Sequence, residues 1–384
     1  MNVMPSYEQE EFRTGVRRLA DAAPLEPGGF DAARYAAAWS RFAEAGVAGL
    51  CLAPVMGGFS GAAEDVALIA AELGRAPGAT PRIETMVLAA VLLSSGAEPA
   101  IARLREKFAA GQSQPAVAWF EGGDPYGQDM PQVQATRTDD GFTLTGRKMA
   151  VIGATTADCL IVTAQLPARG LGLFVVDPAA ARVDMRGYRL SDTTPVADIV
   201  FHDTPALTDR PIAEGEHARA ILHKALDHAL IAQCAATLGG MDRAINLSIE
   251  HLKTRQQFGR PLADFQALQH RVADMFIATN DARSILYAAI AASRGDAVPR
   301  AAAASRCKVK ISTSARSVIG DALHLHGGIG ITTEYPVGHL YRRAMVDSLL
   351  MGDADYHLAR LEAGGVDWRM DEQPAGVVEC LARA

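Results

Sequence analysis

The sequence predicts an α+β multidomain protein with an N-terminal helical domain, a middle antiparallel β-barrel or sandwich, and a C-terminal four-helix bundle. Its apolar residues change from helical to strand periodicity near residue 113 and return to helical periodicity near residue 212. A chain of 384 residues is also long enough for several layers to share a core. We therefore expect domains at residues 1–112, 113–211 and 212–384.

Helical spacing of apolar residues defines the N-terminal domain. Residues 30–46 (FDAARYAAAWSRFAEAG) and 62–76 (AAEDVALIAAELGRA) each form one apolar face, and Gly or Pro separates neighbouring segments. The start of the chain carries acidic side chains from Glu8 onward and no apolar run of signal-peptide length. We expect an amphipathic helix there, and a cytoplasmic protein.

Short runs of β-forming residues make up the middle domain, with turn residues such as Asp140-Gly141 between them. The runs are PAVAWF, VQATRT, GFTLTGRKMAVI, DCLIVTAQL, GLGLFVVD and VADIVFHD. After Glu216, long helical periodicity returns and predicts the helices of the bundle.

Several polar side chains lie at the junction between the first two bundle helices, residues 253–275 (KTRQQFGRPLADFQALQHRVADM). Arg255 at a helix end can pair with a phosphate through its fork of N–H donors. Gly259 lets a flat or anionic ligand approach the backbone. A dinucleotide-sized ligand is therefore one interpretation of this corner.

Charge, apolar runs and cysteine spacing argue against nucleic-acid binding, membrane insertion and a metal site. Lys and Arg total 37 against 44 Asp and Glu, and no basic run with interleaved aromatic residues is present, so we expect no nucleic-acid binding. No run of 18 uncharged apolar residues appears, so we expect no membrane insertion. The five cysteines are scattered without a CxxC pair or a histidine at metal-binding spacing, so we expect no metal site.

Two motifs together resemble the paired signatures of the acyl-CoA dehydrogenase family. The first is Arg255, Phe258-Gly259 and Gln266 followed by QHRVADM, and the second is HLHGGIG at residues 324–330, followed by TEYP and LYRR. The order of helical, β and helical regions agrees with that family's fold. The segments ELGRA and GDADYHL make the chain most similar to the group that includes the small subunit of pimeloyl-CoA dehydrogenase.

The resemblance implies FAD bound between subunits, with the bundle corner of one subunit holding the pyrophosphate of its neighbour's cofactor. The cofactor-binding residues that it implies are Arg255, Phe258, Gln266, His324, Gly327 and Gly328. Arg255 would pair with the pyrophosphate, and Gly328 would let the backbone reach the adenosine half. His324 stands where the family often has Gln, and ordinary helix capping remains an alternative for His324 and Gln266.

The family's chemistry removes the proton α to a thioester and passes the β hydride to FAD, with an electron-transfer flavoprotein or a similar protein as acceptor. A glutamate acts as the base. The two positions where the family places it hold Met351 and Ala229, which cannot accept a proton. Asp353 is a candidate replacement, although an offset of two residues on a helix turns a side chain by about 200°, and a solvated or capping Asp is the alternative.

The residues expected near the flavin ring also differ from the family pattern. Phe120 and Tyr126 lie where the family has Thr and Ser, and Ala150-Val151-Ile152 replaces Trp-Ile-Thr, while Glu121 is retained. Several hydrogen bonds to the flavin would be missing. The two aromatic side chains would either stack on the ring or occupy its space.

Two interpretations of function follow. The chain is a self-sufficient homo-oligomeric flavoenzyme that dehydrogenates an acyl-CoA thioester with a displaced carboxylate, or a non-catalytic subunit in an α2β2 assembly with a homologous dehydrogenase subunit that supplies the Glu. The intact pyrophosphate motifs beside altered ring and base motifs favour the second interpretation, and predict little α-proton abstraction by the isolated chain.

Overall fold

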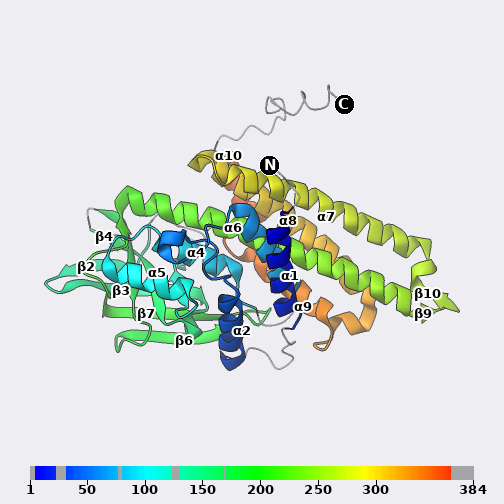
Figure 1. Cartoon of the computed structure of the whole chain (residues 1–384), viewed down its shortest axis with the longest axis horizontal. Coiled ribbons are helices and arrows are strands. Elements are labelled where there is room, and N and C mark those ends of the chain that lie inside the picture. Colours follow the sequence, from blue (N-terminus) through cyan, green and yellow to red (C-terminus); the bar gives the residue numbers. More distant parts are fainter. Residues whose placement is uncertain (1–4, 23–31, 77–79, 123–129, 168, 365–384) are drawn as a thin grey trace, which may run out of the picture.

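The computed structural model describes residues 5–22, 32–76, 80–122, 130–167 and 169–364. Figure 1 shows the β strands at one end of the molecule and the long helices of the bundle at the other. The N-terminal helices are α1 (Tyr7–Asp21), α2 (Ala32–Glu44), α3 (Ala63–Arg75), α4 (Ile83–Leu93) and α5 (Pro99–Ala109). Ser6 caps α1, because its Oγ accepts from the Gln9 N–H at 3.2 Å and the Gln9 side chain accepts from the Ser6 N–H at 2.7 Å.

The middle region is one sheet of eight strands. They are β1 (Pro115–Ala118), β2 (Gln134–Thr138), β3 (Gly141–Ile152), β4 (Cys159–Leu166), β5 (Gly170–Val176), β6 (Val183–Arg189), β7 (Pro195–Pro205) and β8 (Ala213–Glu214). The order is β6-β7-β3-β2-β4-β5-β8, with β1 pairing to β4.

The prediction of a wholly antiparallel domain needs one correction, because the sheet is mixed. β1 runs parallel to β4, and β2 meets β4 in parallel at Gln134 and Gln165. The β2–β3 hairpin lies between β1 and β4 in the chain, so β4 returns to the edge of β1 by a crossover rather than by a tight turn. The other pairs of this sheet are antiparallel, as predicted.

The bundle consists of α6 (Gly215–Thr254), α7 (Gln266–Ala292), α8 (Ala297–His326), α9 (Pro336–Leu349) and α10 (Ala354–Ala363). A two-stranded hairpin, β9 (Gln256–Gln257) and β10 (Arg260–Pro261), joins α6 to α7 and projects from the end of the bundle in Figure 1. None of the helices in the described part of the chain combines the length and the apolar character that a membrane span requires.

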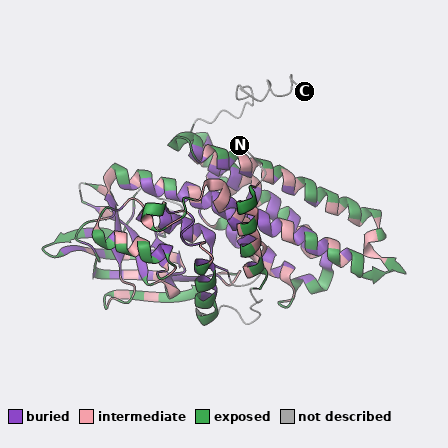
Figure 2. Cartoon of the chain, in the orientation of Figure 1, coloured by how far each residue is buried: buried purple, intermediate pink, exposed green. Residues whose placement is uncertain are grey.

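Helix α6 connects the regions, because it packs against α3 and α4 as well as α8 and β5. Figure 2 shows its middle turns buried. Gly74 of α3 and Gly239 of α6 allow a close crossing, since a Cβ at Gly74 would lie 1.7 Å from the Ala236 carbonyl oxygen and one at Gly239 would lie 1.9 Å from that of Ala71. This crossing fixes the N-terminal helices against the middle of α6.

Candidate functional site

The α6–α7 connection forms an exposed turn at the end of the bundle. Phe258 and Gly259 are its two central residues, with φ angles of 53° and 78°. Positive φ at both positions matches a type I′ hairpin turn, which disfavours a bulky residue such as Phe. The Phe258 side chain is 89% exposed. Such strain is retained at sites where a partner or ligand uses the conformation, so the turn is a candidate contact surface.

The second motif lies at the same end of the bundle. The His326 ring on α8 is 4.6 Å from the ring of His251, which lies one helical turn before Arg255 on α6. At the adjoining Gly327 and Gly328, an added Cβ would meet nothing within 4 Å. We call this surface, residues 253–266 with residues 324–328, the bundle corner.

The six predicted cofactor-binding residues thus lie on the turn and the helix ends that make up the bundle corner, and their role in cofactor binding stays a prediction. Arg255, Gln266 and His324 are exposed, and no ion pair links Arg255 to another described residue. Neighbouring Arg260 differs, because its guanidinium lies 4.0 Å from the centre of the Phe265 ring. Arg255 therefore remains available for an anion from outside the chain.

A cavity of about 90 Å³, the inner cavity, lies where the three regions meet. Its walls come from α4, the end of β1, β3, the middle of α6 and the turn that follows α9. Phe120, Ile152 and Met351 line it, so the altered ring and base positions of the sequence face one space. Tyr126 lies outside the described residues.

Met351 occupies a fixed backbone position in this cavity. Its φ is 58°, and its carbonyl oxygen accepts from His357 Nε2 at 3.0 Å. Burial, followed by the charge of Lys308, lowers the pKa of His357 to about 3, so the ring is neutral and its Nδ1 accepts from the Ser305 hydroxyl at 3.0 Å. These bonds hold the turn without supplying a carboxylate.

The carboxylates near the two usual base positions have structural partners. Asp353 is the N-cap residue of α10, and its Oδ1 accepts from the Tyr356 N–H at 2.8 Å. Asp353 is not part of the lining of the inner cavity, so the structure gives it the capping role that the sequence left as the alternative. Asp227, near Ala229, is buried and pairs with Arg300 at 3.1 Å and Arg360 at 3.2 Å.

Two polar side chains that the sequence did not single out face the inner cavity. Glu84 on α4 is 2% exposed, and Gln233 on α6 is 1% exposed. Glu84 Oε1 accepts from Arg82 Nε, and Gln233 Oε1 accepts from Lys308 Nζ at 2.8 Å. Glu84 Oε2 and Gln233 Nε2 have no hydrogen-bond partner among the residues that the structure describes.

A buried ion network holds these two side chains from behind. Arg82 also donates to Asp347 and to Asp192, the latter at 3.0 Å, and Lys308 donates to the carbonyl oxygens of Asp347 and Leu350. Burial by itself lowers the pKa of Arg82, but the carboxylates around it, led by Glu84, raise that pKa well above its ordinary value. Arg82 is therefore a fixed positive charge, and Asp347 links it to Lys308.

The retained Glu121 belongs to a separate buried pair inside the sheet. It contacts Lys148 Nζ, which also donates to the Thr163 hydroxyl at 2.7 Å. Burial lowers the pKa of Lys148 to about 8, against the opposing effect of Glu121. Lys148 thus joins β3 to β4. Glu121, which follows β1 and also accepts from the N–H groups of Gln132 and Val133, does not line the inner cavity.

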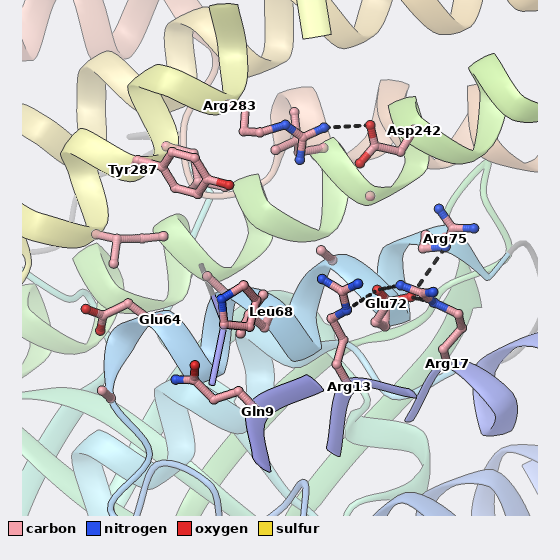
Figure 3. Close-up of a pocket in the computed structure, with 18 of the residues that line it drawn as sticks. Gln9, Arg13, Arg17, Glu64, Leu68, Glu72, Arg75, Asp242, Arg283 and Tyr287 are labelled. Atoms are coloured by element: carbon pink, nitrogen blue, oxygen red, sulfur yellow. Dashed lines mark hydrogen bonds and ion pairs between the residues drawn. The ribbon is translucent and has the colours of Figure 1, made fainter. Parts of the chain in front are cut away.

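A larger groove of about 600 Å³ lies between α1, α3, α6 and α7. Figure 3 shows Arg13, Arg17 and Arg75 gathered around Glu72, and Arg283 paired with Asp242. The nearest contact to Glu72 is 2.6 Å, from Arg17, and the Arg283–Asp242 pair measures 2.7 Å. These charges are occupied in holding α1 and α7 to their neighbours, so the groove is not our candidate site.

Comparison with known proteins decides the family. The model of the acyl-CoA dehydrogenase N-terminal domain matches residues 6–112, and that of the acyl-CoA dehydrogenase C-terminal domain matches residues 219–365. The chain belongs to the acyl-CoA dehydrogenase family. Members of this family are FAD-dependent oxidoreductases that oxidise acyl-CoA thioesters, so the predicted family and enzyme class are confirmed.

Individual relatives cover most of the chain. Acyl-CoA dehydrogenase IpdE2 of Mycolicibacterium smegmatis is 26% identical over 83% of this chain and 85% of its own length. Among solved structures, a variant of the Tcur3481-Tcur3483 steroid ACAD is 27% identical, with a TM-score of 0.79 over 93% of this chain and 97% of that one. Butyryl-CoA dehydrogenase from Megasphaera elsdenii, 23% identical, shares the fold with a TM-score of 0.85 over 96% of this chain and 100% of that one.

Proposed function

We propose that this chain serves the FAD-dependent α,β-dehydrogenation of an acyl-CoA thioester, as a subunit of an oligomer in which its bundle corner binds the cofactor of a neighbouring subunit. The observation that carries the proposal is the position of the corner. Gln233 in the inner cavity and Arg255 at the corner are 22 residues apart on or directly after α6, which corresponds to about 33 Å. That exceeds the span from flavin ring to pyrophosphate in one FAD.

The residues at the corner fit the pyrophosphate of FAD. Arg255 has no ion-pair partner in the described chain, and the open space at Gly327 and Gly328 admits a group close to the backbone. Arg255 and Gly328 would hold the cofactor, with Phe258, Gln266 and His324 beside it. When bound, FAD supplies the hydride acceptor that side chains lack.

We propose a homologous dehydrogenase subunit as the neighbour, in an α2β2 assembly. Met351 and Ala229 at the usual base positions support this, because a partner with the Glu would complete the assembly's chemistry. The name of the 27% identical Tcur3481-Tcur3483 relative joins two designations, which supports a hetero-oligomer. The homo-oligomer remains the second candidate, because Glu84 places a carboxylate in this chain's own cavity.

Sedimentation and turnover test the proposal. We expect the chain, produced alone or with the product of a neighbouring homologous gene, to sediment as an oligomer at micromolar concentration. The FAD-containing oligomer should convert a saturated acyl-CoA to its 2,3-unsaturated product with an artificial electron acceptor. A monomer in both preparations, or an oligomer that binds neither FAD nor any acyl-CoA, contradicts the proposed function.

A further inference from the structure

We propose that Glu84 and Gln233 form a catalytic pair for enolising the acyl thioester in this chain's own inner cavity, with Glu84 as the base and Gln233 as the donor to the thioester carbonyl. This inference rests on the proposed function for its substrate class. It assigns a base to α4, which the family pattern does not indicate. It therefore replaces the expectation from the sequence that the isolated chain abstracts little α proton.

The chemistry of the neighbouring groups identifies which atom of Glu84 and of Gln233 has no hydrogen-bond partner. A lysine ammonium has donors only, so the Gln233 atom that faces Lys308 is the amide oxygen, and the NH2 group is the one without a partner. Glu84 leaves Oε2 without a partner because Arg82 engages Oε1. A buried acceptor and a buried donor, both unpaired, are costly to a folded protein, so their presence in one cavity points to a ligand that pairs with both.

The remaining walls of the cavity narrow the choice of ligand. Leu88, Val117 and Ile152 are apolar, and the hydroxyl of Thr85 in the same lining donates to the Arg82 carbonyl oxygen at 2.7 Å. The ligand must therefore be mostly apolar and carry its polarity at one place. An acyl thioester does so, because its carbonyl oxygen accepts one hydrogen bond and its α carbon carries the acidic hydrogen. One acceptor and one donor therefore match one α-C–H and one carbonyl.

The network behind the pair supplies the positioning that such chemistry requires. Arg82 and Lys308 each hold one member of the pair, and Asp347 contacts both of these cations, through its carboxylate and its carbonyl oxygen respectively. Side chains locked in this way need no reorganisation when charge develops on the substrate. Arg82, Lys308 and Asp347 are positioning residues in this account.

Glu84 and Gln233 lie close to the two positions where the family places its base. Met351, at one usual position, lines the same cavity. Ala229, at the other, lies one turn before Gln233 on α6 and so on the same helical face. Glu84 approaches this space from α4.

The proton transfer balances without a redox partner. Glu84 Oε2 takes the α proton, so the C–H bond breaks and an O–H bond forms. The electron pair moves from the α carbon into the thioester, and the resulting enolate oxygen accepts from Gln233 Nε2. Return of a solvent-exchanged proton from Glu84 restores the thioester, so enolisation in D2O labels the α carbon.

Deuterium exchange tests the pair directly. The full chain, purified without a homologous subunit and supplied with FAD, is incubated with a saturated acyl-CoA in D2O, and α-deuterium is measured by mass spectrometry. We expect exchange by the wild-type chain, a loss of about a hundredfold or more in Glu84→Gln, and a loss of about a hundredfold in Gln233→Leu. The dissociation constant of the acyl-CoA should stay within about threefold in Glu84→Gln, because the lost function is proton transfer rather than binding.

Two further variants keep the test independent of folding. Glu84→Asp retains the charge beside Arg82 but withdraws the carboxylate by one methylene, so exchange should slow at least tenfold with an unchanged unfolding midpoint. Asp353→Asn is the matched control and should exchange within threefold of wild type.

Several outcomes overturn the inference. It fails if the wild-type chain binds the acyl-CoA but exchanges no α-hydrogen, or if Glu84→Gln and Glu84→Asp exchange at the wild-type rate. Preferential binding of a hydroxylated acyl-CoA, lost in Glu84→Gln and unaccompanied by exchange, would assign the pair to recognition of a hydroxyl group instead. None of these outcomes removes the proposed function, which fails if the chain is a monomer in both preparations or if the oligomer binds neither FAD nor any acyl-CoA.

Discussion

The bundle corner and the inner cavity differ in the exposure of their polar side chains and in the partners that the chain itself provides for them. At the corner, Arg255 and Phe258 are exposed, and the guanidinium finds no ion pair in the described chain. In the inner cavity, Glu84 and Gln233 are buried, and Arg82 and Lys308 fix one atom of each. In the proposed function the corner is completed by another molecule, whereas the cavity is organised by this chain's own fold. Variants in the two regions should separate assembly and cofactor binding from folding and proton transfer.

The largest expected effect is on folding, from Arg82→Met. This change leaves Glu84, Asp192 and Asp347 buried without their shared cation, so the free energy of unfolding should fall by about 3–5 kcal/mol. Urea denaturation measures it. The control is Arg147→Met, which removes the 2.6 Å pair with Asp198 from a side chain that is 56% exposed and should cost no more than about 1 kcal/mol. Equal effects of the two changes would show that the cavity is not organised by this network.

Arg255→Ala tests the proposed role of the bundle corner in cofactor binding. A charged bidentate contact contributes about 1.5–3 kcal/mol, so FAD affinity of the oligomer should fall about ten- to a hundredfold while the unfolding midpoint stays constant. Flavin retained on a desalting column reports the affinity. Arg260→Ala, at the same turn, is the control and should retain FAD within about threefold, because Arg260 stacks on Phe265. Full retention of flavin by Arg255→Ala would remove Arg255 from the cofactor site.

Asp353→Ala distinguishes a helix cap from a base. Loss of the bond to the Tyr356 N–H should lower the free energy of unfolding by about 0.5–2 kcal/mol and leave α-deuterium exchange unchanged. Thermal unfolding and the exchange assay measure both quantities. An unchanged stability with abolished exchange would make Asp353 the base and would contradict the assignment of Glu84.

The smallest expected effect is a gain of stability at the corner. Phe258→Asn places a residue that tolerates positive φ at the strained turn, so each chain should become more stable by about 1 kcal/mol. FAD retention should fall in the same variant, because the exposed ring is lost. A loss of stability would show that the Phe258 ring supports the fold, and that the corner is not reserved for a neighbour.

The same contrast explains what the sequence can reveal. Arg255, Phe258 and Gln266 lie within 12 residues, so a local motif that resembles the family pattern could predict them as a candidate site, and the turn lies at the predicted junction of two helices. Glu84, Gln233 and Lys308 come from α4, α6 and α8, and no local pattern connects them. The available signal was the pair of charges in Arg82-Ile83-Glu84 at the start of an otherwise apolar helix.

The sheet shows the same limit of sequence analysis. Six of the eight strands correspond to a predicted run of β-forming residues, whereas β6 and β8 were not predicted. The parallel pairing of β1 with β4 depends on where the β2–β3 hairpin packs. Strand periodicity specifies the faces of a strand and carries no information on its neighbours.

A structure of the FAD-loaded oligomer tests the central claim most directly, because it shows which chain supplies each group around one cofactor. The account predicts that the FAD whose flavin ring borders Glu84 and Met351 of this chain has its pyrophosphate against the bundle corner of a different chain, and that Arg255 of this chain contacts the pyrophosphate of that neighbour's FAD. Glu84 and Arg255 of one chain around the same FAD would contradict it.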